Sequence, residues 1–323
     1  MFNAFTRKIS VALALLAAPL VASGSEAAEK FSLGLNWLPQ AEHCGFYQAQ
    51  AKGLYAAKGL DVEIVPGGPE VNMSLLLANG RVDLALTSML GQLKMTAQGI
   101  PVVSVAAYFQ KDPQTLVAHP DPAVKDIADL KGRPMLIGAY AREEFWQWLK
   151  AKYGFVDEQL RPYTYNAGPF LADPAAVQQG YVTNDGFVLG GPLGAEPKIF
   201  LLADNGYLNY QNAIQATTAT VEAKAGAIKG FLAASSEGWK QCVAGDYAAA
   251  EEAVLKASPD QSKALFEYSM KELIARKIVT GEAGLPIGAM TEPRWKEFSA
   301  AMTAVGVLPK SLDYTKAFTL AFQ

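Results

Sequence analysis

Polar and aromatic side chains that could recognise a small molecule follow the ends of several expected strands in this 323-residue chain. Trp37 and His43 flank the exit of the first expected strand. A flat indole can stack on a heteroaromatic ring, and an imidazole can donate or accept a hydrogen bond. Asn184 and Asp185 follow a strand at residues 180–182. An amide and a carboxylate together can donate to and accept from the polar edge of such a ring, so these side chains suit a flat, polar molecule.

Hydroxyl groups form a second set of candidates. Thr87 and Ser88 stand at a turn from a strand to a helix, where hydroxyls and free backbone N–H groups suit a polar or anionic group. Tyr140 comes directly after a strand that ends near Gly138, which is the equivalent position in the second half of the chain. Both sets of candidates therefore lie where strands are expected to end.

Alternating strands and helices must position these residues. Short apolar runs bounded by glycine or proline predict strands at residues 60–65, 82–86, 102–107 and 134–138, with helices of about ten residues between them. This alternation predicts an α/β protein built from βαβ units with parallel sheets. After about residue 220 the chain is expected to be mainly helical to its end.

Two series of such units, with no linker rich in glycine and serine between them, predict two lobes. We expect residues 28–116 and 213–323 to build one discontinuous lobe and residues 117–212 to build the other, joined by strands that cross between them. Ligands bind outside the carboxyl ends of strands in open α/β sheets. The site is therefore expected in the cleft between the two facing lobes.

Each candidate also has a purely structural explanation. Trp37 can be an aromatic residue that packs the lobes together, and His43 can be a hydrogen-bonded histidine at the start of a helix. Thr87 and Ser88 can cap a helix, and Asn184–Asp185 can form a polar turn before a glycine. Residue type alone leaves both interpretations open.

Residues 1–27 are expected to be a secretory signal peptide. Arg7 and Lys8 precede an apolar run at residues 9–18, and small residues follow as far as Ala27. The run is shorter than the about 20 apolar residues of a membrane-spanning helix. We therefore expect a mature protein in the periplasm, where the oxidising environment permits disulfides.

Composition excludes several classes of function. A net charge of -3 leaves no cationic face for a nucleic-acid backbone, so no nucleic acid is expected as a partner. Two histidines and two cysteines are too few for a metal site built on imidazoles or thiolates. Cys44 and Cys242 are far apart in the chain, so a disulfide and two buried free thiols both remain open.

Several motifs resemble those of the NMT1/THI5-like substrate-binding proteins. The clearest is the stretch at residues 36–47, which reads NWLPQAEHCGFY, and residues 52–62 are similar to the next block of the family. Further matches lie at residues 80–85, 130–132 and 295–322. The resemblance covers essentially the whole chain after the expected signal peptide.

The resemblance implies a monomeric periplasmic receptor of the type II periplasmic-binding-protein fold, which delivers a small molecule to an ABC permease and its ATPase. The motif that contains Asn36, Trp37 and His43 is similar to that of binders of thiamine-precursor pyrimidines and of riboflavin, and it implies that these residues contact the ligand. Relatives usually carry Glu-Pro where this chain has Asp185-Gly186. A small heteroaromatic nutrient is the implied ligand. A nitrate-, sulfonate- or taurine-type anion is the alternative, because the blocks that begin at Lys52-Gly53 and contain Val82-Asp83 are shared with binders of nitrate and sulfonates.

An enzyme is the other alternative, because the family includes a yeast pyrimidine synthase. The synthase carries a lysine for pyridoxal phosphate where this chain has Thr87, and threonine cannot form a Schiff base. The histidine that the synthase consumes falls at Gly91, and its cysteine-rich motif falls near residues 209–216, which contain no cysteine. We therefore expect a binding protein without catalytic residues, metal or cofactor.

Overall fold

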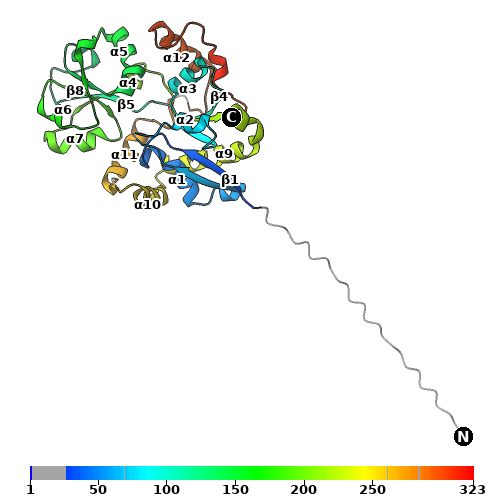
Figure 1. Cartoon of the computed structure of the whole chain (residues 1–323). Helices are drawn as coiled ribbons and strands as arrows, with labels where there is room; N and C mark the ends of the chain where they lie inside the picture. Colours follow the sequence, from blue (N-terminus) through cyan, green and yellow to red (C-terminus); the bar gives the residue numbers. More distant parts are fainter. Residues whose placement is uncertain (2–26, 69, 260, 283) are drawn as a thin grey trace.

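The computed structural model describes residues 1, 27–68, 70–259, 261–282 and 284–323, so nearly all of the expected signal peptide lies outside the described residues. The described chain forms two α/β lobes, each built on a five-stranded sheet (Figure 1). Its α-helices are α1 (Cys44–Ala51), α2 (Met73–Ala78), α3 (Met89–Ala97), α4 (Ala139–Glu144), α5 (Trp146–Tyr153), α6 (Gly168–Ala172), α7 (Asp185–Leu193), α8 (Thr218–Ala223), α9 (Ala225–Val243), α10 (Ala248–Ala257), α11 (Lys263–Ala275) and α12 (Glu292–Ala304).

The first sheet is mixed and not parallel throughout as predicted. Its strand order is β2 (Leu60–Val65), β1 (Glu29–Gly34), β3 (Leu84–Thr87), β10 (Gln211–Thr217) and β4 (Val102–Phe109). β1 is parallel to β2 and β3, whereas β10 is antiparallel to both β3 and β4. The reason is that β10 enters this sheet from the other lobe and therefore runs away from the cleft, whereas β1 and β3 end at it.

The second sheet is also mixed, for the same reason. Its strand order is β7 (Leu160–Pro162), β6 (Met135–Ile137), β8 (Val177–Tyr181), β5 (Gln114–Ala118) and β9 (Lys198–Leu201). β6 is parallel to β7 and β8, and β5 is antiparallel to β8 and β9. β5 follows the crossing from the first lobe, so it begins at the cleft and runs away from it. β6 and β8 run in the opposite direction and end at the cleft.

The chain passes between the sheets in two short segments, residues 110–113 and residues 202–210. The sequence predicts crossing strands at the lobe boundaries, after residues 116 and 212. In the structure β5 lies wholly in the second sheet and β10 wholly in the first. The change of sheet therefore falls in the irregular segments before these strands, and the strands themselves do not cross.

Helices cover both faces of the first sheet. Leu84 and Leu86 of β3 belong to the core that α1 and α9 cover, while Ala85 between them packs with α2 on the opposite face. This alternation is the period of two that a strand imposes on its side chains. The contact between α1 and α9 is close, because a Cβ atom at Gly238 would lie 2.1 Å from the carbonyl oxygen of Gly45.

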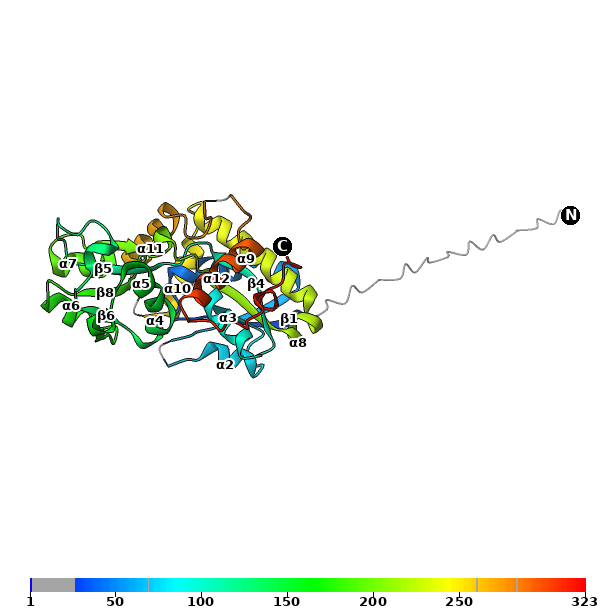
Figure 2. The ribbon, with the colours of Figure 1, turned by 90° about the horizontal axis from the view of Figure 1, so that it is seen from above.

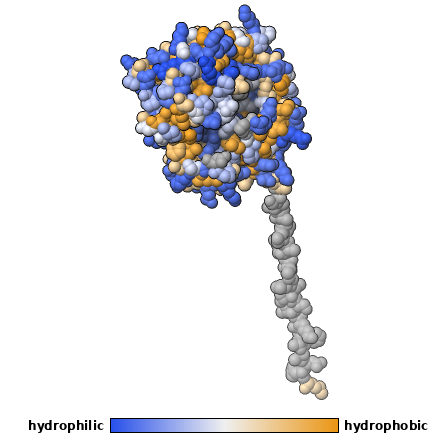
Figure 3. All heavy atoms as spheres, turned by 60° about the vertical axis from the view of Figure 1, so that its left-hand side comes forward, coloured by the Kyte–Doolittle hydropathy of each residue, from blue (hydrophilic) through white to orange (hydrophobic). Residues whose placement is uncertain are grey.

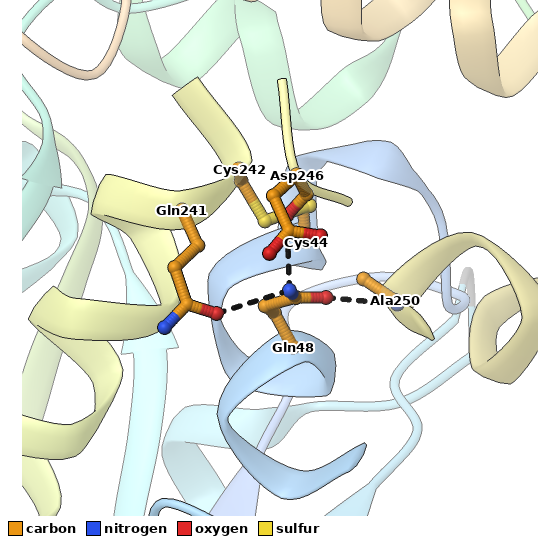
Figure 4. Close-up of a disulfide and its surroundings, with 6 residues drawn as sticks. All are labelled: Cys44, Gln48, Gln241, Cys242, Asp246 and Ala250. Carbon is orange, nitrogen blue, oxygen red and sulfur yellow. Dashed lines mark hydrogen bonds between the residues drawn. A yellow bond between two sulfur atoms is a disulfide. The ribbon is translucent and has the colours of Figure 1, made fainter. Parts of the chain in front are cut away.

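A disulfide fastens these two helices and decides the question that the sequence left open. Cys44 at the start of α1 is bonded to Cys242 in the last turn of α9, and both side chains are fully buried. Beside it, the buried Gln48 donates to Oε1 of Gln241 and accepts from the backbone amide of Ala250 (Figure 4). The bond closes a loop with a sequence separation of 198. By the chain-entropy estimate such a loop stabilises the fold by about 5 kcal/mol.

The C-terminal helices join the lobes more extensively than crossing segments alone would. α11 packs against α9 and α10 of the first lobe, and α12 packs against α3 of the same lobe, in the middle of the molecule in the view from above (Figure 2). Phe298 of α12 packs edge-on against Tyr207, with ring centroids 5.4 Å apart, and Ser269 of α11 donates to the carbonyl of Thr183 at 2.6 Å. One hydrophobic core accordingly contains residues of both lobes and of α12.

Arg294 of α12 holds both crossing segments. Its guanidinium donates to the carbonyl of Gln110 in the first crossing at 2.5 Å, and to those of Leu208 and Asn209 in the second at 2.9 and 3.2 Å. The same group lies 4.0 Å from the ring centroid of Tyr210. We refer to Arg294 and these four residues as the hinge clasp, because one side chain holds together the two crossing segments about which the lobes can bend.

The surface of the folded part is of mixed character. On the face drawn in Figure 3, hydrophilic and hydrophobic residues are interspersed. Among the described residues, none of the helices combines the length and the apolar character that crossing a membrane requires.

Candidate functional site

A cavity of about 770 Å³ lies between the lobes, at the ends of strands of both sheets. The first lobe supplies the loop after β1, the turn from β3 to α3 and the start of β10. The second lobe supplies the segment after β7 and the turn from β8 to α7. This is the position at which open α/β sheets bind ligands, because the carboxyl ends of neighbouring strands meet there.

Seven of the eight predicted site residues line this one cavity. They are Asn36, Trp37, His43, Thr87, Ser88, Asn184 and Asp185. Tyr140, the eighth, lies in α4, and its side chain is outside the part of the structure that is described. The strand-end argument therefore brought together residues that are more than 140 positions apart in the chain, such as Trp37 and Asp185.

Aromatic rings from both lobes face one another across the cavity. The ring centroid of Trp37 lies 5.7 Å from that of Tyr165 at an interplanar angle of 49°, and Tyr165 in turn lies 5.3 Å from Tyr163. Tyr165 is 55% exposed and has a φ of 61°, an uncommon conformation for a side chain of this size. The two tyrosines were not among the predicted site residues, because their sequence separation from Trp37 says nothing of their place across the cleft.

His43 is buried with both ring nitrogens occupied by the protein. Its Nδ1 accepts from the backbone amide of Gln40 at 3.3 Å, so its Nε2 carries the proton and donates to Oδ1 of Asn36 at 3.0 Å. Burial lowers the pKa of His43 to about 3. The imidazole is therefore neutral, and its hydrogen bonds hold the loop after β1 in place.

Asn36 continues this chain of hydrogen bonds to the start of β10. Its Nδ2 donates to Oδ1 of Asn212 at 3.0 Å, and Nδ2 of Asn212 donates to the carbonyl of Glu42 at 2.7 Å. The amides of both asparagines are thus oriented by partners within the protein. Because both residues also line the cavity, their positions are set before any ligand arrives.

Asp185 is held in the second lobe by two donors. Oδ1 accepts from Nε2 of Gln178 at 2.9 Å, and Oδ2 accepts from the backbone amide of Tyr181 at 2.7 Å. Burial raises the pKa of Asp185, and the hydrogen bonds from Tyr181 and Gln178 oppose that shift. A Cβ atom at residue 180 would lie 2.8 Å from this carboxylate, so Gly180 allows the close approach.

The hydroxyls at the end of β3 serve the fold as well as lining the cavity. Ser88 caps α3, since its Oγ accepts from the amide of Gly91 at 2.9 Å, and it donates to Oε1 of Glu144 in the second lobe at 3.3 Å. Thr87 donates to the carbonyl of Ser88 at 3.3 Å. The capping explanation of Ser88 therefore holds together with its place in the cavity wall.

Glu42 is a cavity residue that the sequence argument missed. It lies in the 3-10 helix Ala41–His43, is only 4% exposed, and its Oε1 accepts from the hydroxyl of Thr183 in the second lobe. Burial raises its pKa. A signal was present, since Glu42 is the one charged residue within the stretch at residues 36–47 that carries the family resemblance.

The described lining of the cavity is acidic. It contains the carboxylates of Glu42, Glu70 and Asp185, and neither a lysine nor an arginine is among the described residues that form it. Nor do the described residues contain a group of three or more histidine, cysteine, aspartate or glutamate side chains that could hold a metal ion.

Solved structures share this fold. The periplasmic aliphatic sulphonate binding protein SsuA from Escherichia coli superimposes with a TM-score of 0.66 at 15% identity, and the match covers 89% of this chain and 91% of SsuA. The chain therefore has the periplasmic-binding-protein fold, with two α/β lobes and a cavity between them.

The family follows from the sequence comparison. A family model described as NMT1/THI5 like matches residues 40–249, and this chain belongs to that family. The riboflavin-binding protein RibY of Chloroflexus aurantiacus is 26% identical over 309 residues, which cover 91% of this chain and 86% of RibY. A formylaminopyrimidine-binding protein of Halalkalibacterium halodurans is 37% identical over 86 residues, 27% of this chain and 26% of that protein.

Enzymes of the family are similar over a shorter stretch. A 4-amino-5-hydroxymethyl-2-methylpyrimidine phosphate synthase of Saccharomyces cerevisiae is 30% identical over 142 residues, which cover 43% of this chain and 40% of the synthase. The chain therefore spans less than half of the synthase but most of RibY.

Proposed function

We propose that this protein is an extracytoplasmic solute-binding protein that captures a small heteroaromatic nutrient, such as a thiamine-precursor pyrimidine or a flavin, and delivers it to an ABC importer. The observation that carries the proposal is the lining of the cavity: aromatic rings from both lobes, amides and carboxylates, with no cationic side chain among its described residues. Such a lining suits a flat ring that carries N–H donors.

An anionic ligand fits this lining poorly. A nitrate or sulfonate would stand beside the carboxylates of Glu42 and Asp185, and like charges in a partly desolvated cleft repel each other. Ser88 already caps the N-terminus of α3 and binds one of its amides, which leaves fewer donors there for an anion. An anion binder remains the second candidate, because sulfonate-binding proteins share the fold.

The size of the cavity admits the proposed ligands. Its volume of about 770 Å³ lies within the range of about 300–1,000 Å³ that is usual for small-molecule sites. Trp37 and Tyr165 come from opposite lobes and their ring centroids lie 5.7 Å apart, so a ring that packs beside this pair contacts both lobes. The printed names of RibY and of the formylaminopyrimidine-binding protein support this class of ligand.

Binding and not catalysis is the proposed role. Thr87 lies at the end of β3 in the cavity wall, where the resemblance to the yeast synthase implies a lysine for pyridoxal phosphate. A hydroxyl cannot form the Schiff base that this cofactor requires. Incubation of the purified protein with pyridoxal phosphate should give no imine absorbance band, and a band abolished by replacement of one lysine would contradict the proposal.

A periplasmic, monomeric protein is part of the proposal, with the permease and its ATPase as partners. The disulfide between Cys44 and Cys242 supports an oxidising compartment, since structural disulfides persist there. We expect the mature protein to begin close to Ala28. Its intact mass in a periplasmic extract tests this, and a mass that retains residues 1–20 would contradict it.

Titration calorimetry of the wild type with riboflavin, 4-amino-5-hydroxymethyl-2-methylpyrimidine, taurine and nitrate tests the central proposal. One of the two ring compounds should bind, and Trp37→Ala should weaken it about tenfold or more, since stacking contributes about 0.5–1.5 kcal/mol beyond the lost area. Leu38→Ala, at an exposed neighbour in the same loop, is the control and should bind normally. Binding of taurine or nitrate without either ring compound would refute the proposal.

A further inference from the structure

One buried carboxylate in the cavity joins the two lobes. Glu42 belongs to the first lobe, and Asn212 fixes its backbone by donating to its carbonyl at 2.7 Å. Its side chain accepts from the hydroxyl of Thr183 in the second lobe. The carbonyl of Thr183 in turn accepts from Ser269 of α11 at 2.6 Å. Glu42 therefore stands at a position where the cavity, the second lobe and a C-terminal helix meet.

The charge of Glu42 is poorly compensated within the protein. None of the ion pairs among the described residues includes it. A carboxylate offers about four acceptor positions, and the donors of Glu42 within the protein are the hydroxyl of Thr183 and its own backbone amide, so part of its acceptor capacity is left. Burying a charge without a charged partner or a full set of hydrogen bonds is unfavourable. The raised pKa of Glu42, which results from burial, agrees with this.

The other cavity carboxylates differ from Glu42. Both oxygens of Asp185 accept from donors in its own lobe. Glu70 is exposed, so water satisfies it. Asp185 accepts two hydrogen bonds from other residues of its own lobe, whereas Glu42 accepts one from another side chain, so Glu42 is the buried carboxylate of the described lining with the larger acceptor capacity left for a molecule in the cavity.

We propose that Glu42 is a specificity-determining residue, which accepts a hydrogen bond from an amino group or a protonated ring nitrogen of the bound heterocycle. This inference rests on the proposed function and narrows its ligand to rings that carry an N–H donor. A ring of the same shape without that donor leaves the carboxylate buried and unpaired, so it is rejected. Because Glu42 also binds Thr183, the ligand contact is made at a junction between the lobes.

Two probes of equal size test the proposal. The first is 4-amino-5-hydroxymethyl-2-methylpyrimidine, and the second carries a methyl group in place of the 4-amino group. The wild type should prefer the amino compound by about thirtyfold or more, as expected for a hydrogen bond to a buried charged group. Glu42→Gln keeps the shape and the acceptor for Thr183, and it should reduce this preference about tenfold. Where riboflavin is the ring that binds, the matched pair is riboflavin and its 3-deaza analogue, in which C–H replaces N3–H.

The ratio of the two affinities separates a ligand contact from a structural role. Loss of a structural contact weakens both probes alike, whereas loss of the ligand contact weakens the amino compound and leaves the methyl compound unchanged or bound more tightly. Glu63→Gln, at an exposed carboxylate of β2, is the matched control and should keep the wild-type ratio.

The results of these experiments overturn either this inference alone or the proposed function with it, as follows. Equal affinity of the wild type for both probes, or a wild-type ratio in Glu42→Gln, overturns this inference and leaves ring binding in place, provided that Trp37→Ala still weakens it. Binding of taurine or nitrate without any ring compound overturns the proposed function and this inference together, as does the absence of binding by every probe.

Discussion

Replacing Arg294 by methionine should loosen the joint between the lobes. The substitution removes three hydrogen bonds from a charged donor to the carbonyls of Gln110, Leu208 and Asn209, and with them the contact to the ring of Tyr210. Hydrogen bonds to charged groups contribute about 1.5–3 kcal/mol each. Because water can reach part of the freed carbonyls, we expect a net loss of about 3–5 kcal/mol in the free energy of unfolding.

The hinge clasp links this loss to ligand binding. With its two crossing segments no longer tied together, the ligand-free protein should populate more open arrangements, so its radius of gyration should rise and its affinity for the ring ligand should fall. Urea unfolding followed by tryptophan fluorescence gives the free energy of unfolding, and small-angle scattering with and without ligand gives the radius of gyration. The wild type should contract when the ligand binds, because closure about the crossing segments buries it.

The control is Lys296→Met on the exposed face of the same helix. It removes a positive charge from α12 without touching the crossing segments, and its stability and scattering should match the wild type. The reasoning about the hinge clasp would be refuted if the free energy of unfolding of Arg294→Met lay within about 0.5 kcal/mol of that of this control and the two radii of gyration were the same.

Three further perturbations follow from particular contacts. Burial lowers the pKa of His43 to about 3, below its value in the unfolded chain. The contribution of the neutral imidazole to stability is therefore full above about pH 6.5 and is lost as the pH falls toward 3. His43→Gln should reduce the slope of the unfolding free energy against pH by up to about 1.4 kcal/mol per pH unit between about pH 4 and 6. Reduction of the disulfide between Cys44 and Cys242, or its replacement by two alanines, should lower the free energy of unfolding in urea by about 5 kcal/mol. Thr183→Val keeps the shape of the side chain but removes the donor to Glu42, and it should lower the free energy of unfolding in urea by about 1–3 kcal/mol.

Each of these expectations has a contrary result. Parallel pH profiles for the wild type and His43→Gln would show that this imidazole is not kept neutral by burial. An unfolding curve unchanged by reductant, with free thiols confirmed by alkylation, would remove the disulfide as a source of stability. Wild-type stability of Thr183→Val would show that its hydroxyl is replaced by water at Glu42.

The position of the site could be predicted from the sequence because it depends on local patterns. Trp37, Thr87 and Asp185 each follow a strand, and parallel strands end at one edge of a sheet, so their convergence needed no knowledge of side-chain contacts. The prediction of the crossings between the lobes was less accurate. The expected crossing strands, β5 and β10, each lie in one sheet, and the chain changes sheet a few residues before each of them.

The partners of the site residues could not be predicted in this way. Both nitrogens of His43 are occupied within the protein, and Glu42 receives its hydroxyl partner from Thr183, 141 positions later in the chain. The contact between the rings of Trp37 and Tyr165 likewise depends on the relative orientation of the two lobes. The contacts of Glu42 and Trp37 join the two lobes, and no local periodicity encodes how the lobes pack against each other.

The disulfide has a consequence for the order in which the molecule is completed. The covalent ring that it closes, from Cys44 to Cys242, contains both crossing segments and the whole second lobe, whereas α10, α11 and α12 lie outside it. The bond cannot form before residue 242 has been synthesised, and by then every strand of both sheets is available to pair. A protease that later cuts once within the ring leaves a single molecule, because the two fragments stay linked through the sulfur atoms. The second lobe thus lies wholly within the part of the chain that can be cut once without being lost.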